Sequence, residues 1–130
     1  MSTNYSHNNR YRPPFPSLNI VLRSPEDGLA TASLVVLIDT GADITSIPLR
    51  HLVQVHAPEL DEVRLRSHWG HSVTVITYMV DIEIMTTTLP GIEVVGDVTS
   101  DEIVLGRDVL NHLVLLIDGQ RSTTTILDQR

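Results

Sequence analysis

Residues 34–45 read Leu-Val-Val-Leu-Ile-Asp-Thr-Gly-Ala-Asp-Ile-Thr, an aliphatic run that ends in a carboxylate and a glycine-containing turn. A short apolar run without a polar break is typical of a strand that is buried on both faces. Such a strand would carry the Asp39 carboxylate out of a dry core and into a tight turn, where Thr40 and Gly41 shape the backbone. The stretch therefore predicts one acidic side chain that a rigid interior holds in a fixed place.

Length and composition indicate one domain that is built mainly from strands. A chain of 130 residues is most simply a single domain with a substantial core. Hydrophobic residues make up 42% of it but aromatic residues only 4%, so the interior is rich in Val, Ile, Leu and Thr. These side chains favour strands, and we expect a mostly β fold.

The charge balance and the missing residue types argue against several classes of function. The sequence has 9 Lys and Arg against 16 Asp and Glu and no basic cluster, so we expect no nucleic-acid partner. Without cysteine, it can form neither a disulfide nor a thiolate metal site. No apolar segment has membrane-spanning length and the start lacks the layout of a signal peptide, so we expect a cytoplasmic protein without a membrane partner. The histidines have no carboxylate at helical metal-ligand spacing, so neither a metal nor another cofactor is expected.

The first part of the chain differs from the rest in composition. Residues 1–16 are rich in Asn, Ser, Arg and Pro and show no apolar period, which predicts a flexible N-terminal arm ahead of a domain over residues 17–130. Beyond the arm, apolar runs and turn signals predict short strands and one helical turn. The strands are expected at residues 18–22, 31–38, 44–47 and 62–66, and the helical turn at residues 48–53.

A longer strand is expected over residues 73–85, and its apolar pattern changes partway. Val73 and Val75 place apolar side chains at odd positions, whereas from Ile76 to Ile84 every even position is apolar. Since the side chains of a strand alternate between faces, the change predicts a bulge or a transfer between two environments. A hairpin that leaves the domain body, with Trp69-Gly70 at its tip, would produce this pattern.

The rest of the chain continues in short elements. Pro90-Gly91 predicts another turn, followed by strands at residues 92–95 and 103–105 and a short helix at residues 109–113. Residues 113–117 and 123–127, which are joined through Asp118-Gly119, have the pattern of a closing hairpin. We therefore expect a mostly β domain with one or two short helices.

Two strings resemble the retropepsins, the single-lobed aspartic proteases of retroviruses and their cellular and bacterial relatives. The first is Leu-Ile-Asp-Thr-Gly-Ala-Asp at residues 37–43, and the second is Ile-Val-Leu-Gly-Arg-Asp-Val-Leu at residues 103–110. The resemblance covers residues 17–118 and implies a closed β-barrel-type acid protease lobe that is active as a two-fold homodimer. Because the chain continues through a further hairpin, it is more similar to the free-standing cellular and bacterial members than to the viral ones.

The resemblance implies a role for each residue that matches the family pattern. Asp39 matches the catalytic aspartate, Thr40 the residue whose hydroxyl braces the paired turns, and Gly41 the residue whose carbonyl meets the substrate backbone. Asp43 matches a residue that bonds the substrate main chain. Arg107 matches an arginine that pairs with Asp43 in a bidentate, partly buried ion pair.

The resemblance also implies a flap and a subsite. Trp69, Gly70 and His71 fall where the family carries its flap, the hairpin tip that covers the substrate, and Val104 falls in a substrate-binding position. The viral flap is rich in glycine, whereas this chain has only Gly70 beside the bulky Trp69. An equally simple interpretation of Trp69 is a surface aromatic side chain that packs on the domain body.

The chemistry of the family requires two carboxyl groups about 3 Å apart, which share one proton and so supply both a base and an acid. This chain has one Asp-Thr-Gly string and no second copy, so the pair has to come from two subunits. The sequence thus predicts an aspartic endopeptidase in which two Asp39 carboxylates, one from each subunit of a homodimer, act on an extended polypeptide. The alternative is a catalytically inactive module of the same fold that binds peptide or dimerises.

Overall fold

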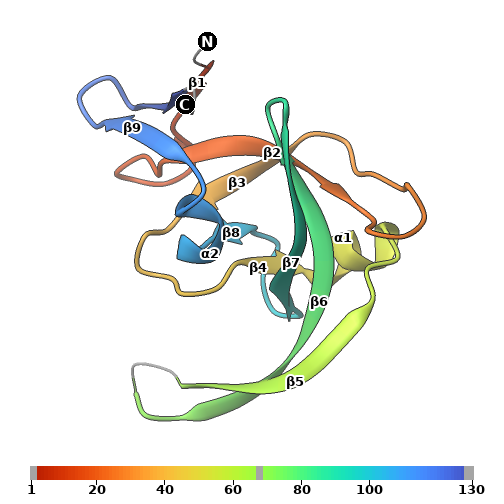
Figure 1. Ribbon diagram of the computed structural model, residues 1–130. Helices are drawn as coiled ribbons and strands as arrows, with labels where there is room; N and C mark the ends of the chain where they lie inside the picture. Colours follow the sequence, from red (N-terminus) through yellow and green to blue (C-terminus); the bar gives the residue numbers. More distant parts are fainter. Residues whose placement is uncertain (1–2, 67–68, 128–130) are drawn as a thin grey trace.

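The computed structural model describes residues 3–66 and 69–127, and within them six strands close into a barrel (Figure 1). Around the barrel the strands follow in the order β2 (Ser17–Arg23), β3 (Leu34–Ile38), β8 (Val104–Leu105), β4 (Ser46–Pro48), β7 (Thr87–Asp97) and β6 (Ser72–Ile84). The barrel closes where β6 pairs back onto β2, with Leu22 opposite Ile82. The predicted mostly β, closed lobe is confirmed.

Aliphatic side chains fill the barrel, as the composition predicts. On β2, every second residue from Leu18 to Leu22 is at most 1% exposed. On β3, the last three residues are all buried although neighbouring side chains point to opposite faces, so the end of this strand is covered on both sides. Val35, earlier in the same run, is 60% exposed, which limits the two-sided burial to the strand end. Asp39, the next residue after β3, therefore starts from a rigid base.

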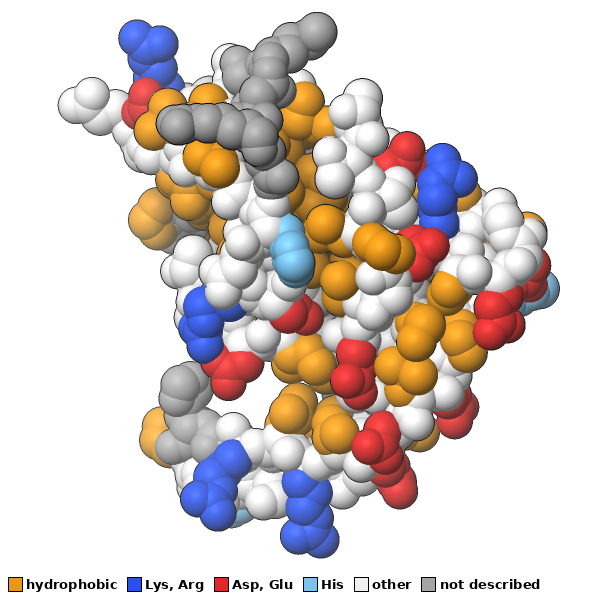
Figure 2. Space-filling view, viewed as in Figure 1, with side chains coloured by type: hydrophobic (Ala, Val, Ile, Leu, Met, Phe, Trp, Pro, Cys, Tyr) orange, Lys and Arg blue, Asp and Glu red, His pale blue; other side chains and the backbone are white. Residues whose placement is uncertain are grey.

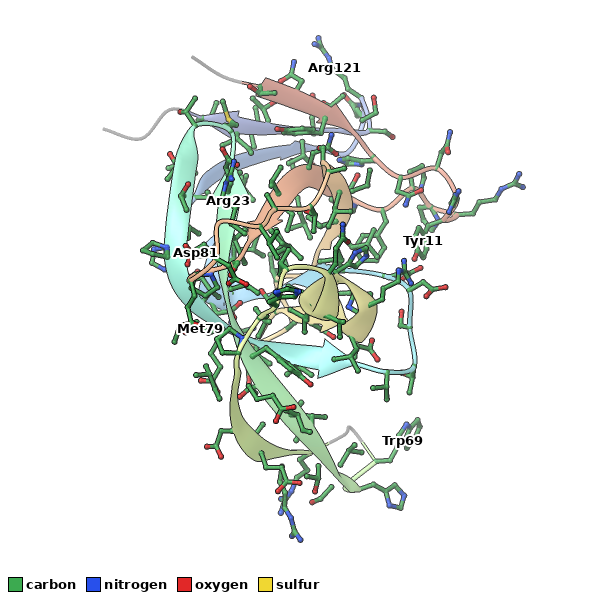
Figure 3. All side chains as sticks on the ribbon, turned by 90° about the vertical axis from the view of Figure 1, so that its right-hand side faces the viewer. Tyr11, Arg23, Trp69, Met79, Asp81 and Arg121 are labelled. Atoms are coloured by element: carbon green, nitrogen blue, oxygen red, sulfur yellow. The ribbon has the colours of Figure 1, made fainter. Side chains whose placement is uncertain are left out.

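β6 passes from the barrel into a projecting hairpin with β5 (Glu59–Arg66), as the change of apolar parity predicts (Figures 1 and 3). The second half of β6 pairs with β2 and β7, whereas its first half pairs with β5, where Val75 lies opposite Val63. Every second residue from Tyr78 to Ile84 is buried, while residues 72–74 are exposed. The strand thus changes its buried environment where it leaves the barrel wall.

The predicted turn at Pro90-Gly91 is wrong. β7 runs through both residues, and the chain reverses at Met85-Thr86 instead. Val80 pairs with Ile92 but Ile82 pairs with Leu89, so Pro90 and Gly91 together lie opposite Asp81 in a bulge. Gly91 takes a φ of +64° there, and its N–H donates to Asp81 Oδ1 at 2.9 Å. Proline suits such a break in the ladder because it has no N–H to donate.

The first and last strands form a second sheet in the order β1 (Thr3–Ser6), β10 (Thr123–Leu127), β9 (Val114–Asp118). The predicted closing hairpin is confirmed as β9 and β10. The prediction of a flexible arm differs from the structure in its described part, residues 3–16. There β1 pairs with β10, Asn8 forms a bridge with Phe15, and the His7 ring lies 3.2 Å from Thr124 Oγ1.

Two short helices connect strands of the barrel. α1 (Leu49–Gln54) follows β4 and α2 (Arg107–Leu110) follows β8, and each turns buried aliphatic side chains into the core. Both lie close to the predicted positions, although α2 begins two residues earlier than the apolar spacing predicts. No helix within residues 3–66 and 69–127 is long and apolar enough to cross a membrane.

Candidate active site

Asp39 lies directly after β3, where the backbone of the neighbouring strand β8 fixes the strand end. The Leu37 N–H donates to Ile103 O at 2.9 Å, and the Asp39 N–H donates to Leu105 O at 3.0 Å. The Gly41 N–H donates to Asp39 Oδ1 at 2.9 Å, so the turn itself orients one carboxylate oxygen. The half-buried carboxylate is therefore held in one orientation at the end of a strand that cannot move independently of the barrel.

Residues 106–108, here named the brace, bind the far end of the Asp39 turn through Thr45. The Thr45 N–H donates to Asp108 Oδ2 at 3.0 Å, and the Thr45 hydroxyl donates to Asp108 Oδ1 at 2.7 Å. The Gly106 N–H donates to Thr45 Oγ1 at 3.0 Å, and the Thr45 side chain is fully buried. These bonds tie the segment that carries Asp39 to the start of α2.

The sequence pattern does not single out Thr45 and Asp108, because the two residues are 63 positions apart in the chain. The one available signal is that Asp108 lies within the second of the two strings that carry the family resemblance, while Thr45 closely follows the first. Their geometry makes them supporting residues, since their polar atoms bond to one another and to backbone amides.

We expect Thr45→Val to lower the free energy of unfolding by about 1–3 kcal/mol, because the isosteric side chain leaves the buried Gly106 N–H without an acceptor. Urea unfolding monitored by circular dichroism measures this change. The matched control is Thr88→Val on the exposed part of β7, which should change the value by less than about 0.5 kcal/mol. Equal values for the two variants would show that the brace does not depend on this hydroxyl.

Arg107 joins the brace to the turn in a different way from the predicted bidentate ion pair. One guanidinium nitrogen, Nη2, donates to Asp43 Oδ1, while Nη1 donates to Thr40 O at 2.7 Å. The side chains are 45% exposed for Arg107 and 85% exposed for Asp43, so the pair is more open to solvent than expected. The predicted pairing is present, but the guanidinium divides its donors between a carboxylate and a backbone carbonyl. Because the ion pair is exposed, it contributes little stabilisation, so the main role of Arg107 is to fix the Thr40 backbone.

The predicted flap residues stand at the tip of the β5–β6 hairpin, at the end far from the barrel (Figure 3). Trp69 is 86% exposed, which contradicts the alternative that it packs on the domain body. Gly70 takes a φ of +80°, a value that glycine accepts without strain and that the tip requires. His71 is exposed beside it, whereas His68 lies outside the described residues.

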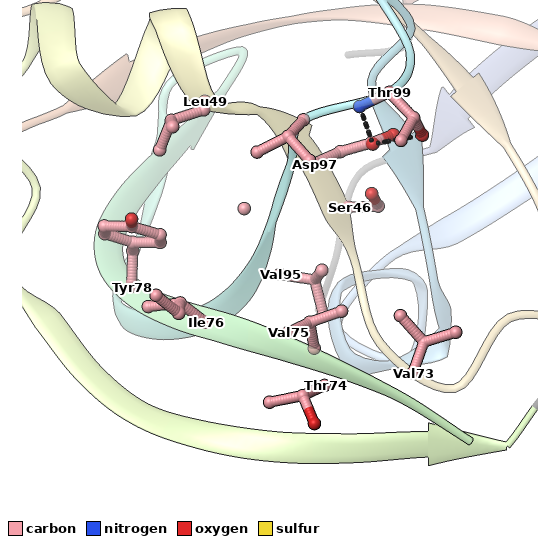
Figure 4. A pocket seen from close by; sticks show the side chains of 12 residues that line it. Ser46, Leu49, Val73, Thr74, Val75, Ile76, Tyr78, Val95, Asp97 and Thr99 are labelled. Carbon is pink, nitrogen blue, oxygen red and sulfur yellow. Dashed lines mark hydrogen bonds between the residues drawn. The ribbon is translucent and has the colours of Figure 1, made fainter.

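A pocket of about 410 Å³ opens between this hairpin and the barrel (Figure 4). In Figure 2 the same region is a hollow between the hairpin and the body, with hydrophobic side chains on both sides. The lining comes from β4, α1, β6, the end of β7 and the loop after it, and includes Leu49, Val75, Ile76, Val95 and Val98. None of these five was predicted as a site residue. Val104, which was predicted, lies half-buried on β8 with Leu37 and Ser46 as its register partners.

Two polar residues at the pocket, Asp97 and Thr99, bond to each other. Asp97 Oδ1 accepts hydrogen bonds from the Thr99 N–H at 2.8 Å and from the Thr99 hydroxyl at 2.9 Å, so this carboxylate shapes the loop (Figure 4). Burial, and secondly the nearby Glu59 carboxylate, raise the pKa of the Tyr78 phenol, which therefore stays neutral. A Cβ added to Gly96 would lie 2.5 Å from Tyr78 Cε1, so the glycine at this position leaves the room that the Tyr78 ring occupies. The pocket is suited to an apolar side chain.

Within residues 3–66 and 69–127, no three His, Cys, Asp or Glu side chains lie together as a metal site would need.

No protein-family model matches the chain, and no curated protein matches its sequence. Solved structures do match its fold. One is a retropepsin-like aspartic protease from Rickettsia conorii, with a TM-score of 0.60 and 14% sequence identity over 97% of this chain and 90% of that one. Another is the EIAV protease complexed with the inhibitor HBY-793, with a TM-score of 0.53 and 20% identity over 75% of this chain and 86% of that one. The chain thus has a retropepsin-like fold.

Proposed function

We propose that this protein is an aspartic endopeptidase in which two Asp39 carboxylates, one from each subunit of a homodimer, activate a water against a peptide bond. The observation that carries the proposal is the way in which hydrogen bonds hold Asp39 and its turn in place. Its backbone bonds to β8, its carboxylate accepts the Gly41 N–H, and the turn after it is tied down by the brace. An ordinary turn between strands does not need this degree of support for a carboxylate, whereas catalysis by a positioned acid and base does.

The reaction uses the two carboxyl groups as a pair. Two such groups about 3 Å apart cannot both ionise, so they hold one proton between them. The ionised member takes a proton from the attacking water, and the protonated member gives one to the carbonyl oxygen or to the leaving nitrogen. The apparent pKa values then belong to the pair rather than to either Asp39.

The residues around Asp39 have supporting roles in this proposal. The Thr40 hydroxyl braces the two turns against each other, and the exposed Gly41 and Asp43 are available to the main chain of an extended substrate. Arg107 holds the Thr40 carbonyl and Asp43 in place by donating a hydrogen bond to each.

The β5–β6 hairpin is the flap that covers the bound substrate. Trp69, Gly70 and His71 are the flap tip in this proposal, Val104 contributes to substrate binding on the barrel side, and closure of the tip excludes water. The pocket between the hairpin and the loop after β7 accepts an aliphatic side chain of the substrate.

We expect Val98→Asp to lower kcat/KM for substrates with an aliphatic side chain at this position by about ten- to a hundredfold, because it places a charge in an apolar pocket. Val98 is 78% exposed, so the change should leave the free energy of unfolding unaltered. The matched control is Val53→Asp on α1, where the valine is 63% exposed and outside the pocket. Cleavage of a peptide library by the three proteins measures the preference. An unchanged preference in the Val98 variant contradicts the assignment of this pocket.

The proposed function is tested by digestion of an unstructured polypeptide at several pH values between mildly acid and neutral. Cleavage that depends on Asp39 supports it. Absence of cleavage from a dimeric, folded protein at every pH favours the alternative, a module of the same fold that binds peptide or only dimerises.

A further inference from the structure

β5 is a free edge of the barrel sheet and borders the projecting hairpin. It pairs with β6 on one side only, and among residues 3–66 and 69–127 no backbone group bonds to its other side. The hairpin stands away from the barrel, which leaves this side open (Figures 1 and 3). A free row of N–H and C=O groups pairs with other strands, and natural proteins protect such edges with charged side chains or proline.

The charges of β5 are separated by sign along the strand. It reads Glu-Leu-Asp-Glu-Val-Arg-Leu-Arg, with all three carboxylates before Val63 and both guanidinium groups after it. Glu62 and Arg64 are exposed, and no ion pair within the described residues engages either of them. An edge with charges of one sign repels its own copy. This edge instead attracts a copy that runs antiparallel to it, because each acidic half then meets a basic half.

The backbone of β5 presents the amides of the same residues to the free side. The Glu62 N–H donates to Asp61 Oδ1 at 2.7 Å instead of entering the ladder with β6. Neighbouring residues of a strand direct their amides to opposite sides, so the Arg64 N–H and C=O also lie on the free edge, whereas those of Val63 face β6. The exposed Asp61 side chain thus caps an amide that a second strand can take over.

We propose that β5 pairs antiparallel with β5 of a second copy of this chain, with Val63 opposite Val63 of that copy. A two-fold axis requires one residue to lie opposite its own copy, because hydrogen-bonded and non-hydrogen-bonded pairs alternate along an antiparallel ladder. In this register Glu62 of each chain lies opposite Arg64 of the other, and the two residues exchange both backbone hydrogen bonds. The contact goes beyond the proposed function, because it involves neither Asp39 nor its turn.

Charge selects this register among those that the strand allows. A centre at any of the three charged residues nearest to Val63 places that residue opposite its own copy. A centre at Leu65 places Arg64 opposite Arg66. Centres nearer the strand ends leave too few pairs to form a ladder. The register centred on Val63 brings no like charges into direct opposition, so the charge pattern specifies both the partner and the alignment.

The contact is weak by its size and sensitive to salt. One pair of strands buries less surface than a standard interface, so we expect association that depends on protein concentration. Its charges are exposed, and added salt therefore weakens it. Each homodimer of the proposed function carries two copies of β5, so the same edge would link dimers into larger assemblies.

Cross-linking through one introduced thiol tests the register, because the chain has no cysteine. Val63→Cys places two thiols in a non-hydrogen-bonded pair, whose Cα atoms lie about 4.5 Å apart, within the range that a disulfide spans. Leu65→Cys is the matched control on the same face of the same strand, where the two thiols lie about 13 Å apart along the strand. We expect oxidation at high protein concentration to link most of the Val63→Cys protein into covalent pairs, and Leu65→Cys only at the background level.

Exchange of charges between two variants gives the second measurement. Glu62→Arg and Arg64→Glu each place like charges opposite each other, so we expect each variant alone to associate at least about tenfold more weakly than the unchanged chain. An equimolar mixture of the two should recover the lost association, because each chain then offers the charge that the other lacks. Sedimentation velocity over a range of concentrations at low salt measures both effects. Glu26→Arg, in the exposed turn after β2, is the control that should leave association unaltered.

The outcomes keep this inference apart from the proposed function. Covalent pairs of Val63→Cys in a protein that cleaves no polypeptide support the edge contact, although the proposed function fails. Equal cross-linking of the two cysteine variants overturns the contact, because random collision does not distinguish the two positions. A mixture of the charge variants that associates no better than its components overturns it as well. Neither of these two results bears on cleavage by Asp39.

Discussion

We expect the Asp39→Asn protein to cleave at least about a thousandfold more slowly than the unchanged chain while it stays folded and dimeric. The amide has nearly the same volume as the carboxyl group, and its oxygen can still accept the Gly41 N–H, so the turn keeps its geometry. It can neither take a proton from water nor give one to the peptide, which removes both halves of the proposed chemistry. Initial rates on an unstructured polypeptide, measured with sedimentation velocity on the same samples, test both parts.

The control for this prediction is Asp27→Asn, a change of the same kind in the turn after β2. It removes one charge from a carboxylate that bonds to Ser24 and His56 rather than to the Asp39 turn, and it should leave the cleavage rate within about twofold. If Asp39→Asn cleaved as fast as the unchanged chain, the activity would belong to a contaminant, and the binding or dimerisation module would be favoured.

Mixing the two proteins extends the same test to the dimer. When equal amounts of the unchanged and Asp39→Asn chains exchange subunits, about a quarter of the dimers contain two intact carboxylates. The rate should then fall to about a quarter of that of the unchanged protein at the same total concentration, whereas independent monomers would keep about half. A value of one half after exchange would show that each chain works alone.

Gly106→Ala is expected to lower the free energy of unfolding by about 1–3 kcal/mol, because the site has no room for a Cβ. An added Cβ would lie 2.8 Å from the Ile44 carbonyl carbon and 3.0 Å from Ala42 O, both of them backbone atoms that cannot rotate away. The brace and the Asp39 turn would have to separate, and a shift of about 1 Å at a catalytic group reduces rates by about a hundredfold. Urea unfolding and initial cleavage rates measure the two effects.

Gly119→Ala is the matched control, because a Cβ there meets no atom within 4 Å. It should change the free energy of unfolding by less than about 0.5 kcal/mol. If both alanine variants were equally stable and active, the close contact between Gly106 and Ile44 would not be needed to place Asp39.

The sequence predicted the parts of the fold that depend on local pattern. An apolar run before a turn signal located β2, two-residue alternation located β6, and the parity change within β6 correctly indicated that the strand leaves the barrel. Pro90-Gly91 misled because proline and glycine break a strand ladder in a bulge as readily as in a turn, and only the partner strand decides between them. That partner, Asp81, caps the bulge from across the sheet.

The error in the N-terminal segment and the residues missed in the site have a different cause, which is distance along the chain. β1 is polar and gains its order from β10, so residues 3–6 carry no apolar period of their own. Likewise, the bond between Thr45 and Asp108 has no local signal. Asp39 was predictable because its strand and turn are neighbours in sequence, whereas the groups that hold the turn are not.

The pairing of β1 with β10 has a consequence for folding. Thr3 lies opposite Ile126, so the two paired strands come from distant parts of the chain. Closing so long a loop costs more conformational entropy than forming the local hairpin of β9 and β10, so we expect β1 to join the sheet after that hairpin has formed. β10 then offers β1 an edge that is already in place, and the polar N-terminal strand becomes ordered late.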